Sequence, residues 1–140
     1  MKEKKEMVLT PDTALAREPE ERQKLDLIRK MAAAAAEAIE EKKGEHVEIL
    51  NVTSKTTLAD VFVLASGTSG IHVKTLAESV EEKLEQEFGL RPDHIEGLEN
   101  RNWILLDYGD LIVHILIPED RAHYKLENLW RVDVDKRPVQ

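Results

Sequence analysis

Three groups of residues in this sequence have types and spacing that could do chemistry. The first is the turn SGTSG, residues 66–70, between an apolar run and a helical pattern. Such a turn can hold a phosphate on the free N–H groups of a helix N-terminus. This one lacks the lysine of a P-loop and the three-glycine spacing of a dinucleotide fingerprint, and Ile71 replaces the last glycine of a nucleophile elbow. The pattern favours a tight turn with a capping hydroxyl, with a nucleotide-binding or transferring enzyme as the alternative.

The second group is the pair Asp107 and Asp110. Nucleotidyltransferases hold magnesium with paired carboxylates, because that ion prefers hard oxygen ligands. Here the two aspartates flank a Tyr-Gly turn and are not two apart on one strand face, so we expect them to point in different directions. Aspartate is frequent in turns, where it satisfies local backbone N–H groups. The spacing therefore favours a structural role and predicts no catalytic carboxylate pair.

The third group is the histidines, which lie in separate predicted elements. No two have the one-turn helical spacing that zinc enzymes use, and the chain has no cysteine. Isolated histidines in apolar strands, such as the one in LIVHILI, are more often structural groups held by hydrogen bonds. We therefore expect no metal and no cofactor from His46, His72, His94, His114 and His123.

Composition limits the class of protein. The chain has 140 residues, enough for one domain, and no apolar run approaches the roughly 20 residues that span a membrane. The N-terminus lacks the apolar core of a signal peptide, so we expect a soluble, cytoplasmic protein with no membrane partner. A net charge of −8 argues against direct nucleic-acid binding, because phosphates select clustered lysine and arginine. Residues 1–17 are polar and predict a flexible leader.

The elements that position these residues follow from the apolar periodicity. We expect a helix from Pro19 to Gly44 and a second from the 66–70 turn, capped by Thr68 or Ser69, to Gly89. Strands are expected at 47–52, 61–65, 94–99, 103–107 and 111–117, and a last helix after Pro118. Hairpins join the last three strands, and the strand-helix-strand crossover makes one pairing parallel. The predicted fold class is α/β (α+β), a mixed sheet of about five strands with helices packed on it.

All the tryptophans and tyrosines lie in one C-terminal segment. Trp130 continues the apolar side of the last predicted helix, which favours core packing. Trp103 begins a strand that is apolar on both faces, so one face lies on the core and the other is either covered or displayed. Tryptophan and tyrosine are enriched in interface hot spots. The pattern leaves both interpretations of Trp103 open.

Longer strings carry a resemblance to a known family. DVFVLASGTS, HVKTLAESVEEKL, IEGLENRNWILLDYGDLIVHIL and EDRAHYKLENLW resemble the ribosomal silencing factors, the RsfS or Iojap-like proteins, over roughly residues 20–131. The ordered matches include Ser66-Gly67, Trp103, Gly109-Asp110 and Leu129-Trp130. The resemblance places that family's domain at residues 18–132, followed by a short tail of residues 133–140.

The resemblance implies a translation repressor and not an enzyme. Such a protein binds the large ribosomal subunit through ribosomal protein L-fourteen and sterically blocks joining of the small subunit when nutrients are short. A role in large-subunit biogenesis is the related alternative. The family fold is similar to a nucleotidyltransferase core without the catalytic site, and members form homodimers.

The resemblance also implies where the partner binds. The surface should centre on Trp103, with Leu105, Asp107, Tyr108 and Asp110 nearby, which favours display of the indole. An aromatic anchor with a carboxylate rim suits a basic ribosomal protein. One position departs from the family pattern: many relatives have arginine just before the His-Val pair, where this chain has Ile71.

Overall fold

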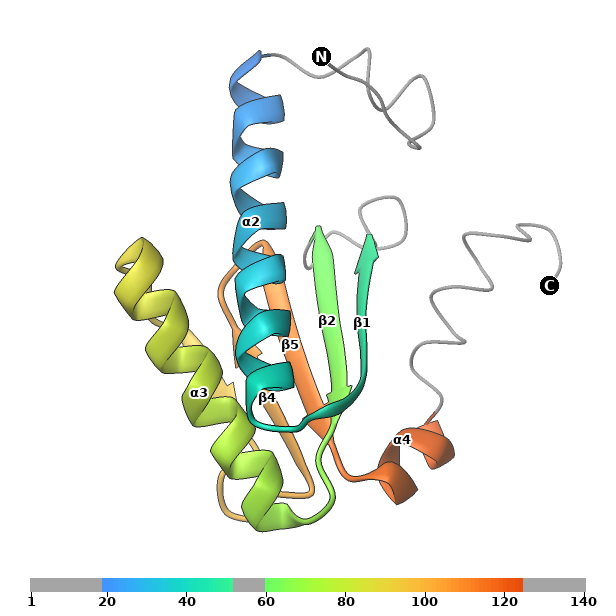
Figure 1. Cartoon of the computed structure of the whole chain (residues 1–140). Helices are drawn as coiled ribbons and strands as arrows, with labels where there is room; N and C mark the ends of the chain where they lie inside the picture. Colours follow the sequence, from blue (N-terminus) through green and yellow to red (C-terminus); the bar gives the residue numbers. More distant parts are fainter. Residues whose placement is uncertain (1–18, 52–59, 125–140) are drawn as a thin grey trace, which may run out of the picture.

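The computed structural model of the chain describes residues 19–51 and 60–124, which form three helices and five strands. The mixed α/β fold and the predicted order of elements are confirmed within this part of the chain. The leader of residues 1–17, Val52, Trp130 and the tail lie outside the described residues. In chain order the elements are α2 (Pro19–Glu41), β1 (Glu45–Asn51), β2 (Val61–Ser66), α3 (Gly70–Phe88), β3 (His94–Glu96), β4 (Trp103–Asp107), β5 (Leu111–Leu116) and α4 (Pro118–Tyr124) (Figure 1).

The five strands form one mixed sheet in the order β1-β2-β5-β4-β3. β2 and β5 run parallel, whereas β1 with β2, β4 with β5, and β3 with β4 pair antiparallel. The crossover through α3 carries the chain from β2 to the far edge strand β3. Two hairpins then bring it back beside β2, so β5 and not β3 is the parallel partner of β2.

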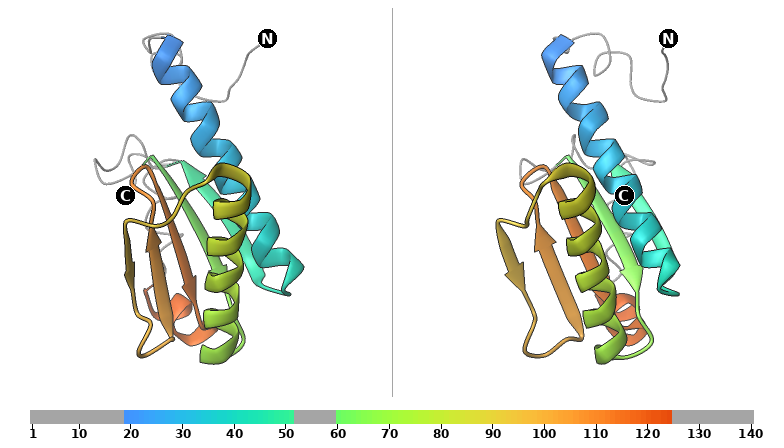
Figure 2. Two further views of the ribbon diagram at one scale, coloured as in Figure 1. Left: turned by 90° about the vertical axis from the view of Figure 1, so that its left-hand side faces the viewer. Right: turned by 60° about the vertical axis from the view of Figure 1, so that its left-hand side comes forward.

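Two helices cover one face of this sheet. α2 and α3 lie side by side there, α2 over β1 and β2 and α3 over β4 (Figure 2). Neither they nor α4 is long and apolar enough to cross a membrane. Val73, Val80 and Leu84 mark the fully buried stripe of α3. Beneath the helices lie alternate residues of three strands: Val61, Val63, Ala65, Ile104, Leu106, Leu111, Val113 and Ile115.

The opposite face of the sheet carries the other set of alternating residues. Phe62 of β2 and Ile112 of β5 form a small buried cluster there, against which Leu50 and Leu105 pack. Every residue of β2 and β5 is buried, so these central strands are covered on both sides. The sheet therefore has two apolar faces, but only one of them lies under α2 and α3.

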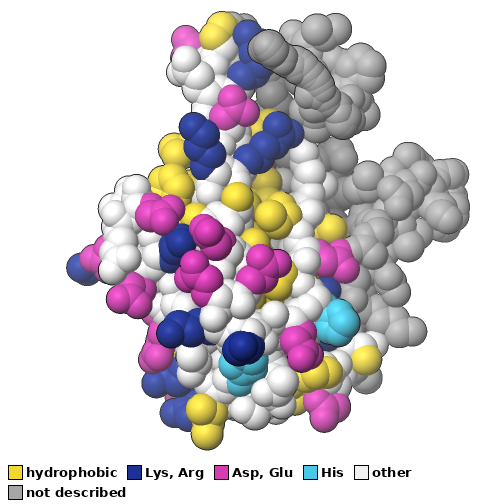
Figure 3. All heavy atoms as spheres, viewed as in Figure 1, with side chains coloured by type: hydrophobic (Ala, Val, Ile, Leu, Met, Phe, Trp, Pro, Cys, Tyr) yellow, Lys and Arg dark blue, Asp and Glu magenta, His cyan; other side chains and the backbone are white. Residues whose placement is uncertain are grey.

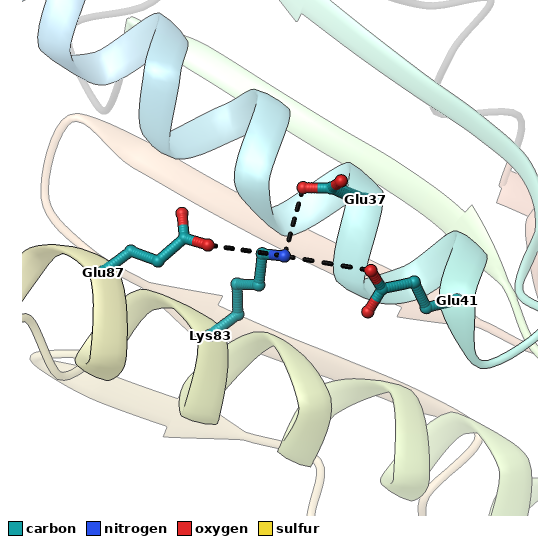
Figure 4. A network of polar contacts seen from close by, with 4 residues as sticks. All are labelled: Glu37, Glu41, Lys83 and Glu87. Atoms are coloured by element: carbon teal, nitrogen blue, oxygen red, sulfur yellow. Dashed lines mark ion pairs between the residues drawn. The ribbon is translucent and has the colours of Figure 1, made fainter.

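A lysine joins the two helices where they run side by side. The Lys83 Nζ on α3 lies 3.1 Å from Glu37 and 3.9 Å from Glu41 of α2, and 3.4 Å from Glu87 one turn along (Figure 4). The hydrogen bond that the Lys83 amine donates to the Glu37 carboxylate raises the pKa of Lys83, so the amine stays charged. Acidic and basic side chains are interspersed over this helix side (Figure 3). The described part of it therefore has no continuous basic surface for a phosphate backbone.

The turn before α3 is held by its own hydroxyl and by a histidine. Of the two expected caps, Ser69 accepts a hydrogen bond from the His72 N–H at 3.2 Å. The His72 ring accepts from the Thr68 N–H at 2.9 Å, and its Nε2 donates to the Lys42 carbonyl at 2.8 Å. The turn is thereby tied to the end of α2, and Gly89 ends α3 in the left-handed region as expected.

Two strands differ from the sequence prediction. The strand expected over 94–99 ends at Glu96, because Gly97 has a φ of 91° and turns the chain. A Cβ at that position would overlap the Trp103 carbonyl oxygen, so the turn requires glycine. The first strand begins at Glu45, and an irregularity between Glu45 and Glu48 disturbs its alternation. Ile49 pairs with Val63 and so points to the helix side of the sheet, but on this edge strand it is 47% exposed.

A buried arginine fastens α4 to the sheet. Arg121 is 6% exposed, and its Nη1 donates to the His46 carbonyl at 2.6 Å and to the Ser66 hydroxyl at 3.2 Å. Its Nη2 lies 3.6 Å from the Glu48 carboxylate. A buried charge is tolerated only when it is matched in this way. The helix expected after Pro118 begins at Pro118 itself, and the arginine fixes it beside β1 and β2.

Candidate partner-binding site

Trp103 is the first residue of β4 and lies half-buried on the sheet face opposite the helices. Its Nε1–H donates to Nδ1 of His114 on β5 at 3.2 Å, and the ring centroids are 6.0 Å apart. The strand register pairs Trp103 with Leu116, so His114 is its diagonal neighbour, within reach of an aromatic side chain. The indole is thus neither fully buried nor freely displayed.

His114 occupies the middle of the opposite face. Its side chain is 7% exposed, and its ring meets Phe62 edge-on at 5.0 Å. Because Nδ1 accepts the indole hydrogen bond, the proton of the neutral ring is on Nε2, which is buried and has no hydrogen-bond partner among the described residues. Burial lowers the pKa of His114 to about 4, so the imidazole is neutral at physiological pH.

A depression of about 390 Å³ opens beside the indole. Its walls come from β3, the turn after β3, β4 and the first turn of α4, and two of its residues are carboxylates. One of these, Glu96, also lies 2.8 Å from the His94 imidazole. The mixture of an indole, a leucine, two carboxylates and two amides suits a positively charged side chain. The lining residues are Glu96, Gly97, Asn100, Asn102, Trp103, Leu105 and Asp120.

Three of the five predicted partner-binding residues share this face. Trp103, Leu105 and Asp107 alternate along β4 and point away from the helices. Leu105 lines the depression and packs against the small apolar cluster. Asp107 accepts a hydrogen bond from the Gly109 N–H at 2.8 Å, so one oxygen of this carboxylate already holds the turn.

The other two predicted residues lie elsewhere. Tyr108 packs against the main core under the helices, and its buried hydroxyl has no hydrogen-bond partner among the described residues. Burial, and the nearby negative charge of Glu81, raise the pKa of this phenol above its ordinary value. Asp110 points to α2, where its carboxylate lies 3.2 Å from the Lys24 amine. The structure therefore does not bring Tyr108 and Asp110 to the depression beside Trp103.

Four lining side chains were not predicted from the sequence. Glu96 lies in the strand expected at 94–99 and Asp120 in the helix expected after Pro118, while Asn100 and Asn102 lie between two expected strands. Their convergence depends on the Ile117 N–H, which donates to the Asn102 carbonyl at 2.9 Å and holds the turn next to the start of α4. The Asn-rich turn could have indicated a polar surface here. No periodicity, however, links Asn102 to Asp120, which lies 18 residues later in a helix.

The residues considered for catalysis do not form a common centre. Asp107 bonds to its own turn while Asp110 pairs with α2, so the two carboxylates point in different directions, as predicted. In the 66–70 turn, the Ser69 hydroxyl is engaged by the His72 N–H. Within residues 19–51 and 60–124, no three acidic or histidine side chains group as metal ligands.

Comparisons with known proteins point to one family. Residues 19–140 match the family model described as ribosomal silencing factor during starvation. A ribosomal silencing factor of Halalkalibacterium halodurans is 38% identical over 96 residues, covering 69% of this chain and 81% of that protein. Another, from Chromobacterium violaceum, is 38% identical over 103 residues, with 74% and 84% covered. A mouse protein, 28% identical over 95 residues (66% of this chain, 41% of that protein), is named mitochondrial assembly of ribosomal large subunit protein 1.

Solved structures agree with the observed fold. A crystal structure of a Chromobacterium violaceum protein, 38% identical, matches with a TM-score of 0.70 and covers 74% of this chain and 85% of that one. A Bacillus halodurans structure, 34% identical, matches with a TM-score of 0.63 and covers 73% and 94%. Both identities are high enough that the likeness extends beyond fold alone.

Proposed function

The chain belongs to the ribosomal silencing factor family, and from that membership we propose that it is a translation repressor of the large ribosomal subunit. In this proposal the protein acts in the cytoplasm when nutrients are short. It binds ribosomal protein L-fourteen and blocks association with the small subunit by occupying the space that the small subunit needs. The activity is regulatory and not enzymatic, and the protein forms a homodimer.

One observation supports the binding step above the others, namely the depression beside Trp103. It combines a half-buried indole with the carboxylates of Glu96 and Asp120. A lysine or arginine of L-fourteen could enter with its charge between the carboxylates and its stem against the indole. A cation over an aromatic face contributes about 0.5–2 kcal/mol, more as water is excluded. Leu105 supplies apolar area beside it, and Asp107 supplies further negative charge.

Electrostatics of the whole molecule agrees with a basic protein partner. The net charge of −8 repels ribosomal RNA phosphates and attracts cationic protein surfaces, so the fold would select the protein component of the subunit. Binding of this kind needs no chemistry at the site. A rigid domain of this size on the subunit interface is sufficient to prevent joining, because the two subunits must come into direct contact there.

Sedimentation of the purified chain with separated ribosomal subunits tests the proposal. The wild-type chain should travel with the large subunit alone and should reduce formation of joined ribosomes. Trp103→Ala should weaken large-subunit binding by about tenfold or more, as expected for a hot-spot tryptophan, while the folded state is retained. Leu27→Ala, at a residue that is 46% exposed on α2, is the control and should bind normally.

The result for Trp103→Ala separates two roles. If its thermal unfolding collapses while the remaining folded fraction binds normally, Trp103 is a core residue and the site assignment fails. If the wild-type chain does not sediment with large subunits, or if subunits join normally in its presence, the repressor function fails. Binding of isolated L-fourteen to the wild-type chain and to Trp103→Ala decides whether L-fourteen is the protein that this surface contacts.

A second candidate function is large-subunit assembly, favoured by the name of the mouse relative. The two functions differ in when the protein matters. An assembly factor is needed during growth, so its removal should lower the yield of complete large subunits in well-fed cells. A silencing factor can be removed from growing cells without that effect, and its loss should raise the fraction of joined ribosomes only on starvation.

A further inference from the structure

The Trp103 indole needs a fixed orientation to act as an anchor, and the structure shows how one edge of it is held. Trp103 lies at the end of a short strand and is only half-buried, so packing covers only part of the ring. Its Nε1–H donates to Nδ1 of His114 at 3.2 Å. A side chain that is ordered before binding loses less entropy in the complex. The hydrogen-bond acceptor on β5 is therefore relevant to affinity.

The position of His114 allows it to fix the orientation of the Trp103 side chain. It lies on a central strand, where the register sets it between Leu64 of β2 and Leu105 of β4. Its ring contacts Phe62 and is 7% exposed. A ring packed on all sides in this way keeps its Nδ1 lone pair in one direction, towards Trp103.

Folding alone does not account for a histidine at this position. Its neighbours in the strand are Val113 and Ile115, and its cross-strand neighbours are leucines. An apolar side chain of similar size would fill the space without a buried Nε2–H, for which no partner exists among the described residues. A buried donor without a partner lowers stability. The presence of His114 is thus better explained by its Nδ1, which accepts the hydrogen bond from the Trp103 indole.

We propose that His114 is a positioning residue that orients the Trp103 indole for the partner through the Nε1–H···Nδ1 hydrogen bond. This inference rests on the proposed function, since it names a second residue on which the same partner surface depends. His114 makes no contact with the partner itself. It acts by keeping the indole in the arrangement in which one face lines the depression.

Two substitutions separate this role from packing. His114→Asn places an amide oxygen close to the position of Nδ1 and retains an acceptor for the indole. His114→Leu fills a similar volume and has no acceptor. The leucine variant should unfold at the same temperature as the wild type or higher, yet bind large subunits about threefold to tenfold more weakly. The asparagine variant should be less stable but bind more tightly than the leucine variant.

The free protein provides a second readout that does not involve the ribosome. The indole N–H resonance of Trp103, identified by its absence in Trp103→Phe, should move and exchange faster with water in His114→Leu, and should change less in His114→Asn. An unchanged resonance in His114→Leu, or binding that follows stability in both variants, overturns the positioning role while leaving the proposed function intact. If the wild-type chain fails to bind large subunits although the resonance behaves as expected, the proposed function is what fails.

Discussion

The two faces of the sheet are built from the same strands but from different kinds of residues. Under α2 and α3 the strands contribute only valine, isoleucine, leucine and alanine, and these form one continuous core. The opposite face mixes apolar residues with Trp103, His114, Asp107 and Glu96. The first face supplies most of the hydrophobic stabilisation. The second retains polar groups that a purely stabilising face would not contain, which is typical of a surface selected for binding.

The contrast is sharpest for buried polar atoms. On the helix side, the Tyr108 hydroxyl belongs to a large ring whose apolar area compensates for an unpaired oxygen. On the opposite side, the His114 ring is smaller and sits among leucines, so its unpaired Nε2–H has less compensation. The two faces of the same sheet therefore differ in role: the helix side is built for stability, and the opposite side keeps polar groups that suit binding.

The largest expected effect is on the free energy of unfolding, and it differs between two adjacent leucines on β4. Leu106→Ala opens a cavity under the helices, where the side chain is 1% exposed, and should lower the free energy of unfolding by about 3 kcal/mol. The folded fraction should still bind large subunits normally. Leu105→Ala, at the half-buried neighbour, should cost only about 1 kcal/mol of stability but weaken binding. Urea unfolding and sedimentation of both variants measure this, and equal effects on binding would remove the distinction between the faces.

The next effect is the pH dependence of stability that His114 contributes on the opposite face. Burial lowers the pKa of His114 to about 4 from 6.5. Between these two pH values the unfolded chain binds more protons than the folded chain. The contribution of His114 to the free energy of unfolding is therefore complete above about pH 6.5 and is lost as the pH falls towards 4. The loss amounts to about 3 kcal/mol at most. Urea unfolding from about pH 7 to 4.5 should therefore show a steeper decline for the wild type than for His114→Leu. Parallel declines would show that His114 is not buried as described.

A smaller effect is expected from the charges of the depression. Glu96→Gln with Asp120→Asn removes two carboxylates from its walls and should weaken large-subunit binding by roughly threefold to tenfold, with a weaker dependence on salt. The double variant Glu40→Gln, Glu82→Gln makes the same change in net charge on the helix side and serves as the control. Equal weakening by both would mean that overall charge, and not this depression, attracts the partner.

The smallest effect concerns Asp110, which the sequence placed in the partner surface and the structure pairs with Lys24. Both side chains are largely exposed, so Asp110→Asn should change the free energy of unfolding by less than about 1 kcal/mol. Large-subunit binding should be unchanged within error in a sedimentation titration. A tenfold loss of affinity would instead extend the partner surface around the end of β4 towards α2.

Much of the fold could be read from local patterns. The helix-capping residues Ser69 and Gly89, the stop before Gly44 and the break at Pro118 are local signals, and the structure confirms each of them. The end of β3 was missed because it depends on contact between Gly97 and the Trp103 carbonyl, which is not a property of either segment alone. The sequence attributed the parallel pairing to the crossover, which joins β2 to β3, whereas β2 pairs with β5, because periodicity gives strands but not their neighbours.

The candidate site shows the same division. Alternation correctly grouped Trp103, Leu105 and Asp107 on one face. It could not show that Tyr108 turns under the helices or that Asp110 meets Lys24, because the direction of side chains in a turn depends on what packs against it.

By itself, the sequence determined the elements, the α/β class and the family, because hydrophobic periodicity, caps and ordered motifs are written along the chain. Only the tertiary structure decided that β3, its turn, β4 and α4 enclose one depression, and that His114 holds the Trp103 indole. The physical reason is that these contacts join residues 11 or more positions apart, from Trp103 to His114 and from Asn102 to Asp120. Their distances are fixed by strand register and by buried anchors such as Arg121, which no local preference encodes.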